Sequence, residues 1–284
     1  MDLNQVLIES AKDGNMLVLK TALEKGANIN AKDGSGMTAL MYATQRGDED
    51  IVNFLKEKGA KEEETDLAIV YYNRGKTYLD SGKYQQAIDE FTKVVELIPY
   101  YANAYFTRGL AYYKLDEHLK AIEDYTKAIE LNLDIRRIVE DNYPHSQYAD
   151  PYFARGLAYG YGKSGHLKAI EDYTKAIELN PKYANAYLNR GAAYLISNEY
   201  QKAIDDFTKS IELVPQLADA YYSRGLLYGV IGEYQKLIDD YYQAGILYLK
   251  QNNKTQALMC IDLMKKVDSS SLLIDKLQNL IDQI

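Results

Sequence analysis

Residues 184–215 read ANAYLNRGAAYLISNEYQKAIDDFTKSIELVP, and this stretch decides the fold. Within its second half the apolar residues Ala203, Ile204 and Phe207 recur at the three- and four-residue spacing of one helix face. Pro215 closes the stretch, because proline cannot continue a helix. The stretch therefore predicts two helices joined by a turn.

The same pattern recurs along the chain, aligned on an Arg-Gly pair. The pairs follow one another at intervals of 34, 47, 35 and 34 residues, at Arg74-Gly75, Arg108-Gly109, Arg155-Gly156, Arg190-Gly191 and Arg224-Gly225. Each arginine has a tyrosine three residues before it and another four residues after it. We predict that these tyrosines, with those at the inter-helix turn (Tyr84, Tyr200, Tyr234), are packing positions of the core.

This pattern resembles the tetratricopeptide repeat (TPR), whose unit is a helix–turn–helix of 34 residues. The resemblance covers about residues 67–250, with five full units. A sixth glycine, Gly245, follows Gly225 by only 20 residues. We therefore expect the second helix of the fifth unit to serve also as the first helix of the next hairpin.

The end of the chain carries the pattern of one more helix. Its apolar stripe is predicted at Leu273, Leu277, Leu280 and Ile284. A solenoid needs a terminal element with a polar outer face. Residues 269–284 are therefore predicted to be a capping helix.

Residues 1–61 repeat at a different period. Gly14 and Gly47 are 33 residues apart, and the segment 28–40 resembles the turn and first helix of an ankyrin repeat. Two residues depart from that pattern, with Ala39 in place of proline and Met41 in place of histidine. Two units are fewer than a free-standing array needs, so we expect this segment to pack on the first TPR hairpin.

These patterns define an all-α fold class. We predict an α-solenoid of helix–turn–helix repeats, with about two ankyrin-like units in 1–61 and five to six TPR units in 62–268. The 47-residue interval between the second and third Arg-Gly pairs predicts an insertion at about 134–148. Repeat insertions often map to a binding face, which makes this insertion a candidate contact.

Charge and composition narrow the classes of partner. The chain has 33 basic and 41 acidic residues, a net charge of −8, which disfavours nucleic acid. Neither a signal peptide nor an apolar stretch of membrane-spanning length is evident, so we predict a cytoplasmic protein without membrane contact. The single cysteine, Cys260, lies in an amphipathic pattern and is predicted to be a buried thiol.

No motif typical of catalysis or of metal binding stands out from the repeat pattern. We find no Ser/His/Asp, Cys/His or paired-carboxylate arrangement, and predict no catalytic residue, no metal site, no cofactor and no enzyme activity. Each repeat has one arginine, in its Arg-Gly pair. It also has two adjacent acidic residues in its second helix. We therefore predict that each arginine pairs with one of these acids, which gives a ladder of ion pairs between helices. An unpaired buried arginine would be costly.

The resemblance to TPR proteins implies a concave groove lined by the first helix of each unit. The side chains predicted to face it are aromatic, aliphatic, amide or lysine: Tyr72, Asn73, Lys76, Phe106, Leu110, Phe153, Leu157, Leu188, Asn189, Tyr222 and Leu226. A row of apolar side chains facing solvent indicates an interaction surface. Of these residues only Lys76 is basic, and Asp150 and Asp219 flank the groove, which disfavours the capture of a carboxylate terminus.

The function predicted from these observations is a protein–protein interaction adaptor or scaffold that binds a partner peptide or helix in the groove. The ankyrin-like segment would act as a cap and as a second candidate site. A secreted effector or immunity-type protein that binds one target is an open alternative, as is a homo-oligomer whose second copy covers the groove. An enzyme or nucleotide-binding protein on a repeat scaffold is the alternative of another class.

Overall fold

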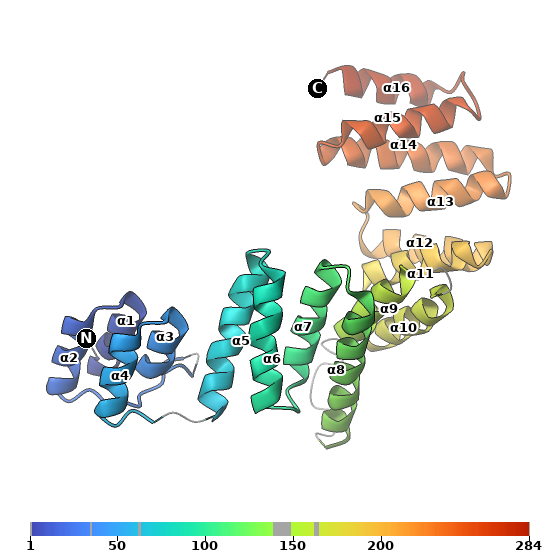
Figure 1. The fold of residues 1–284 in the computed structure, drawn as a ribbon. Helices are drawn as coiled ribbons and strands as arrows, with labels where there is room; N and C mark the ends of the chain where they lie inside the picture. The colour runs from blue at the N-terminus through green and yellow to red at the C-terminus, as the bar shows by residue number, and fades with distance from the viewer. Residues whose placement is uncertain (1, 35, 62–63, 139–148, 162–164, 284) are drawn as a thin grey trace. The chain divides into compact units, whose positions relative to one another are not determined.

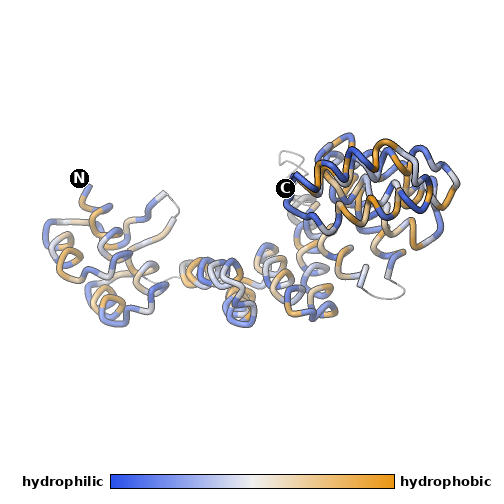
Figure 2. The backbone as a smooth tube through the Cα atoms, turned by 90° about the horizontal axis from the view of Figure 1, so that it is seen from above, coloured by the Kyte–Doolittle hydropathy of each residue, from blue (hydrophilic) through white to orange (hydrophobic). Residues whose placement is uncertain are grey.

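The computed structural model describes residues 2–34, 36–61, 64–138, 149–161 and 165–283. These residues form sixteen α-helices and contain no β-strand (Figure 1). Consecutive helices pack as antiparallel pairs within each repeat, as α5 does with α6 and α11 with α12. Apolar and polar residues alternate along the helices (Figure 2), and no helix of the described part is long and apolar enough to cross a membrane. The predicted all-α repeat class is confirmed.

The chain divides into two compact units, Met1–Arg137 and Ile138–Ile284. The division falls inside the insertion predicted at about 134–148. Residues 139–148 lie outside the described residues, but α8 (His118–Ile138) continues to Ile138. The boundaries predicted at residues 61 and 268 stay predictions.

The first unit contains eight helices, four short ones followed by four longer ones. They are α1 (Leu3–Asp13), α2 (Met16–Glu24), α3 (Ala39–Arg46), α4 (Glu49–Glu57), α5 (Glu64–Asp80), α6 (Tyr84–Leu97), α7 (Ala102–Lys114) and α8. Gly14 and Gly47 end α1 and α3 with φ of 74° and 75°, a conformation that favours glycine. Two equivalent helix pairs therefore begin the chain, as the 33-residue period predicts.

The short helix pairs contact the first long helix. Met37 and Met41 form a buried cluster with Val70 of α5, and the exposed fractions of the three residues are 2%, 3% and 1%. Met41 stands where the ankyrin pattern has histidine, so this departure supplies an apolar contact. The prediction that the segment packs on the first TPR hairpin is confirmed for α3 and α5.

The second unit also contains eight helices. They are α9 (Ala149–Gly160), α10 (His166–Leu179), α11 (Ala184–Ile196), α12 (Tyr200–Leu213), α13 (Ala218–Val230), α14 (Tyr234–Lys250), α15 (Lys254–Lys265) and α16 (Leu272–Asp282). We call α5, α7, α9, α11 and α13 the first helices of the repeats, and their successors the second helices. The buried alanine Ala203 and the fully buried Phe207 of α12 join α11 and α13 into one core.

The glycine of each Arg-Gly pair lies against an aromatic ring of the second helix. A Cβ atom at Gly191 would be 2.8 Å from Cε1 of Phe207. Such a contact forces a shift of the ring or of the helix, because cores are close-packed. Glycine at this position therefore allows the two helices of the hairpin to approach.

Gly191→Ala is expected to destabilise the fold despite the higher helix propensity of alanine. Overpacking costs about 1–3 kcal/mol, whereas the propensity gain is about 1 kcal/mol. Urea unfolding followed by circular dichroism measures the difference, with Gly160→Ala as the control, since no atom lies within 4 Å of a Cβ there. Equal gains in stability in both variants would show that the close approach is unimportant.

The last three helices pack as a group. α14 packs against α13, α15 and α16, so it closes the fifth hairpin and opens the next one, as predicted. Cys260 of α15 is fully buried in their core, and burial raises the pKa of its thiol to about 12. The predicted buried thiol is confirmed.

Two sequence predictions need correction. The buried stripe of α16 is Ile274, Leu277 and Ile281, whereas Leu280 is 39% exposed. The helix thus faces α14 and α15 through positions i, i+3 and i+7 counted from Ile274. The predicted position Ile284 lies outside the described residues. Tyr234, the first residue of α14, is 57% exposed and is not a core residue.

Candidate protein-binding face

The arginines of the repeats are paired with the second acid of each acid pair. Arg190 donates from Nε and Nη2 to the two carboxylate oxygens of Asp206, with both distances 2.8 Å. The pairs Arg108–Asp124, Arg155–Asp172 and Arg224–Asp240 have the same two-bond geometry, and Arg74 pairs with Glu90. The predicted ion-pair ladder is confirmed.

Each ion pair is largely shielded from solvent. The side chains of Arg190 and Asp206 are 16% and 8% exposed, and Arg190 also donates to Thr174 of the preceding repeat over 3.0 Å. Burial raises the pKa of the Asp172 carboxyl above its usual value, and the facing guanidinium of Arg155 opposes that shift. The arginines therefore stabilise the fold and its repeat contacts, and do not form a binding stripe.

In the first unit, the predicted groove residues lie on α5 and α7 and are half-buried or exposed. The Tyr72 ring packs against Phe91 and Tyr101, with ring centroids 5.6 and 5.2 Å away, and burial raises its pKa to about 12. Phe106 packs against Tyr125 at 5.9 Å. These two aromatic residues thus contribute one edge to the core and one edge to the surface.

The three other candidates of the first unit differ in their surroundings. The Asn73 amide donates to Sδ of Met37 over 3.6 Å, so it contacts the ankyrin-like segment. Lys76 is exposed and Leu110 is half-buried. Asn73 is therefore an interface residue within the chain, a role that the repeat pattern of α5 alone does not indicate.

In the second unit, the six candidates lie on α9, α11 and α13. Leu226 is 41% exposed, while Phe153, Leu157, Leu188 and Tyr222 are half-buried. The Asn189 amide donates to the backbone oxygen of Asn185 in its own helix over 2.8 Å. The first helices of this unit thus present apolar side chains that the second helices cover only in part.

The sequence predictions missed two tyrosines that complete this face. The Tyr183 hydroxyl donates to Asp150 over 3.0 Å, and the Tyr248 hydroxyl donates to Asp219 over 2.6 Å. Burial, followed by the neighbouring carboxylate, raises the pKa of both phenols, which keeps the hydroxyls protonated as donors. The recurrence of Tyr-Ala-Asn-Ala-Tyr at 101–105 and 183–187 is a signal that could have indicated Tyr183.

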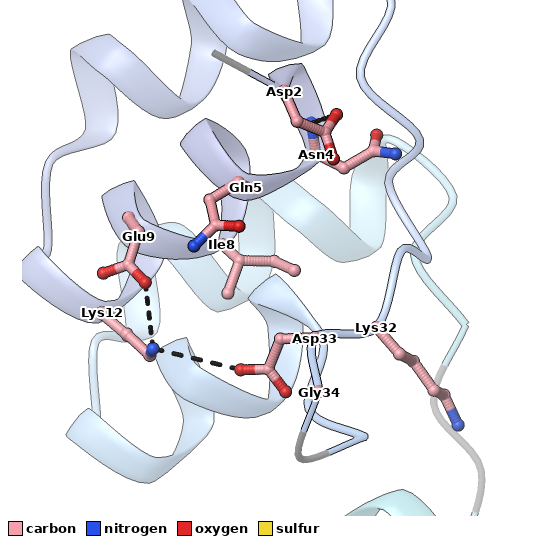
Figure 3. Close-up of a pocket in the computed structure, with 9 residues that line it drawn as sticks. All are labelled: Asp2, Asn4, Gln5, Ile8, Glu9, Lys12, Lys32, Asp33 and Gly34. Atoms are coloured by element: carbon pink, nitrogen blue, oxygen red, sulfur yellow. Dashed lines mark hydrogen bonds and ion pairs between the residues drawn. The ribbon is translucent and has the colours of Figure 1, made fainter.

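A separate polar cavity of about 410 Å³ lies in the ankyrin-like segment (Figure 3). Lys12 stands between Glu9 and Asp33 in it, with Nζ–carboxylate distances of 3.1 and 4.0 Å. Tyr42 donates to the same Asp33 over 2.7 Å. Across the described residues, no group of three His, Cys, Asp or Glu side chains could hold a metal ion.

Three family models, for two kinds of repeat, match the sequence. The family described as ankyrin repeats (many copies) matches residues 7–55. The family described as TPR repeat matches residues 75–116 and 167–197, and the family described as tetratricopeptide repeat matches 102–134 and 184–217. Both matches agree with the helix pairs of the structure.

Known proteins are similar to parts of the chain. A crystal structure of the MamA protein is 25% identical with a TM-score of 0.56, over 66% of this chain and 95% of that one. MamA residues 41 to the end from Desulfovibrio magneticus RS-1 are 17% identical with a TM-score of 0.56, over 66% and 97%, a likeness of fold alone. The potassium channel AKT2/3 of Arabidopsis thaliana is 40% identical over 55 residues, which are 19% of this chain and 7% of the channel.

Proposed function

Because the chain belongs to the repeat proteins and joins ankyrin repeats to tetratricopeptide repeats, we propose that it is a scaffold that binds other proteins. Within each compact unit the binding surface is the face of the first helices, and its occupant is a peptide or helix of a partner protein. Repeat arrays build extended surfaces of this kind because each repeat adds one helix to the same face.

One observation carries this proposal, namely the contrast between the arginines and the apolar residues of the same helices. The arginines form ion pairs with carboxylates of the second helices, so their charges are used within the fold. The apolar residues between them, among them Leu157 and Leu226, keep part of their surface in water. Apolar side chains that recur at the solvent side of successive helices support an interaction site there.

The position two residues after each arginine offers a way to alter this face without unfolding the chain. It holds Lys76 in α5, Leu157 in α9 and Leu226 in α13. Because a lysine is accommodated at this position in α5, a lysine is expected to be tolerated in the other two helices. Lysine carries a strongly hydrated charge and would oppose apolar contact.

Leu157→Lys combined with Leu226→Lys is expected to abolish partner binding while the thermal melt stays within a few degrees of the wild type. Affinity capture with mass spectrometry, from an extract of the cells that produce the protein, measures the loss. Leu119→Lys combined with Leu167→Lys is the matched control, since these leucines are 79% and 59% exposed on the second helices α8 and α10. Partners that the double variant still retains would place the binding surface elsewhere.

A further inference from the structure

Two of the first helices in the second unit carry an exposed carboxylate one turn before an aromatic ring. In α9, Asp150 precedes Phe153, and the Phe153 ring lies 4.7 Å from the ring of Tyr183. The Tyr183 hydroxyl holds Asp150 over 3.0 Å. We call Asp150, Phe153 and Tyr183 site 1.

The same arrangement occurs in α13, two repeats further on. Asp219 precedes Tyr222, whose ring lies 6.5 Å from that of Tyr248, and the Tyr248 hydroxyl holds Asp219 over 2.6 Å. Tyr248 lies in α14, whereas Tyr183 precedes α11. The two tyrosines thus come from different elements, but both sites combine a carboxylate, an aromatic ring and a tyrosine hydroxyl. We call Asp219, Tyr222 and Tyr248 site 2.

The helix between these sites has different chemistry at the same positions. In α11, Asn185 stands at the position of the carboxylates and Leu188 at the position of the aromatic rings. α11 packs against both α9 and α13, so Leu188 lies on the helix between site 1 and site 2. Along the second unit, the first helices therefore carry site 1 on α9, the apolar Leu188 on α11 and site 2 on α13.

A carboxylate beside an aromatic ring is suited to a cationic side chain. The carboxylate accepts charge-assisted hydrogen bonds, and the π face attracts the cation. Asp150 and Asp219 are exposed, and no described lysine or arginine forms an ion pair with either. The tyrosine hydroxyls fix the orientation of both carboxylates, which lowers the entropic cost of binding a cation.

We propose that the face of α9, α11 and α13 binds a partner segment with two basic side chains, one in each site, and an apolar side chain between them over Leu188. This inference rests on the proposed function and adds the chemistry of the partner. A segment without basic residues would leave both carboxylates without a counter-charge.

The helix spacing sets the separation of the two basic residues. Packed helices lie about 8–10 Å apart, so the sites are about 16–20 Å apart. An extended segment rises about 3.3 Å per residue, and residues an even number apart share a face, which gives a separation of about six positions. A helical segment, at about 1.5 Å per residue, requires about eleven positions, because that separation also returns to the same helix face.

Selection of randomised peptides displayed on phage against the full chain tests this inference. We expect the binders that are lost with Leu157→Lys/Leu226→Lys to be enriched in paired lysine or arginine at one of these separations. Asp150→Asn combined with Asp219→Asn is expected to weaken such peptides at least tenfold in fluorescence anisotropy. Asparagine fits the position, since α11 has Asn185 there.

The control variant changes the net charge by the same amount at other exposed acids. Asp205→Asn combined with Asp239→Asn removes two exposed carboxylates of the second helices α12 and α14 and is expected to leave the peptide affinity unchanged. Face-dependent binders without basic residues, or equal weakening by both pairs of variants, would overturn the inference and leave the proposed function standing. If no binder depends on the face, the proposed function fails, and the inference fails with it.

Discussion

Arg190→Ala is expected to lower the free energy of unfolding of the second unit by about 3–5 kcal/mol, because it leaves the Asp206 carboxylate buried without its counter-charge. Asp206 is 5% exposed, and Arg190 supplies both of its hydrogen bonds from the guanidinium. The substitution also removes the hydrogen bond from Arg190 to Thr174 of the preceding repeat. Urea unfolding followed by circular dichroism measures the loss.

A surface pair of the same repeat is the control for this effect. Lys202 forms an ion pair with Glu199, and its side chain is 61% exposed. Exposed pairs of this kind contribute little to stability, because water screens both charges. If Arg190→Ala costs no more than Lys202→Ala, the ladder does not stabilise the repeats. Adding Asp206→Leu to Arg190→Met should recover most of the loss, because a buried pair can be replaced by apolar side chains.

Leu277→Ala is expected to loosen α16 from α14 and to expose Cys260. Leu277 is fully buried, and one of its methyl groups would clash with a Cβ at Gly245, which shows how closely the two helices approach. Removing a buried leucine side chain costs about 2–5 kcal/mol. Since tenfold in an equilibrium corresponds to about 1.4 kcal/mol, the open state should become at least about thirtyfold more populated.

Alkylation of Cys260 by iodoacetamide reports this opening. In the wild type the thiol is buried with its pKa raised to about 12, so labelling at pH 8 is expected to be slow until denaturant is added. Leu277→Ala should accelerate labelling at least about thirtyfold, whereas Leu280→Ala, at a position 39% exposed, should not. Equal rates in the two variants would mean that α16 does not cover the thiol.

The repeat period predicts the helix pairs well, because each unit contains complete signals for its turns and its core. Both partners of each ion pair can be predicted from the same period, since one arginine and one acid pair occur in every repeat. Which acid of a pair faces the arginine does not follow from the period. Adjacent residues of a helix point about 100° apart, and only the packing of the hairpin shows that Asp206 rather than Asp205 faces Arg190.

Two features needed the structure because they depend on contacts between elements. The stripe of α16 has two readings in sequence, through Leu273 and Leu280 or through Ile274 and Ile281, and the sequence pattern does not decide which one is buried. The pairing of Tyr183 with Asp150 joins residues 33 positions apart. The local motif at 183–187 marks the tyrosine, but the motif does not give its partner, because the contact with Asp150 arises from the stacking of repeats.

Hydrogen exchange of the full chain, alone and saturated with a captured partner, tests the central claim most directly. If the first helices form the binding face, the added protection will fall on α9, α11 and α13, and the second helices α10 and α12 will exchange as before. Protection confined to the second helices or to the ankyrin-like segment would contradict the claim that the partner binds to the face of the first helices.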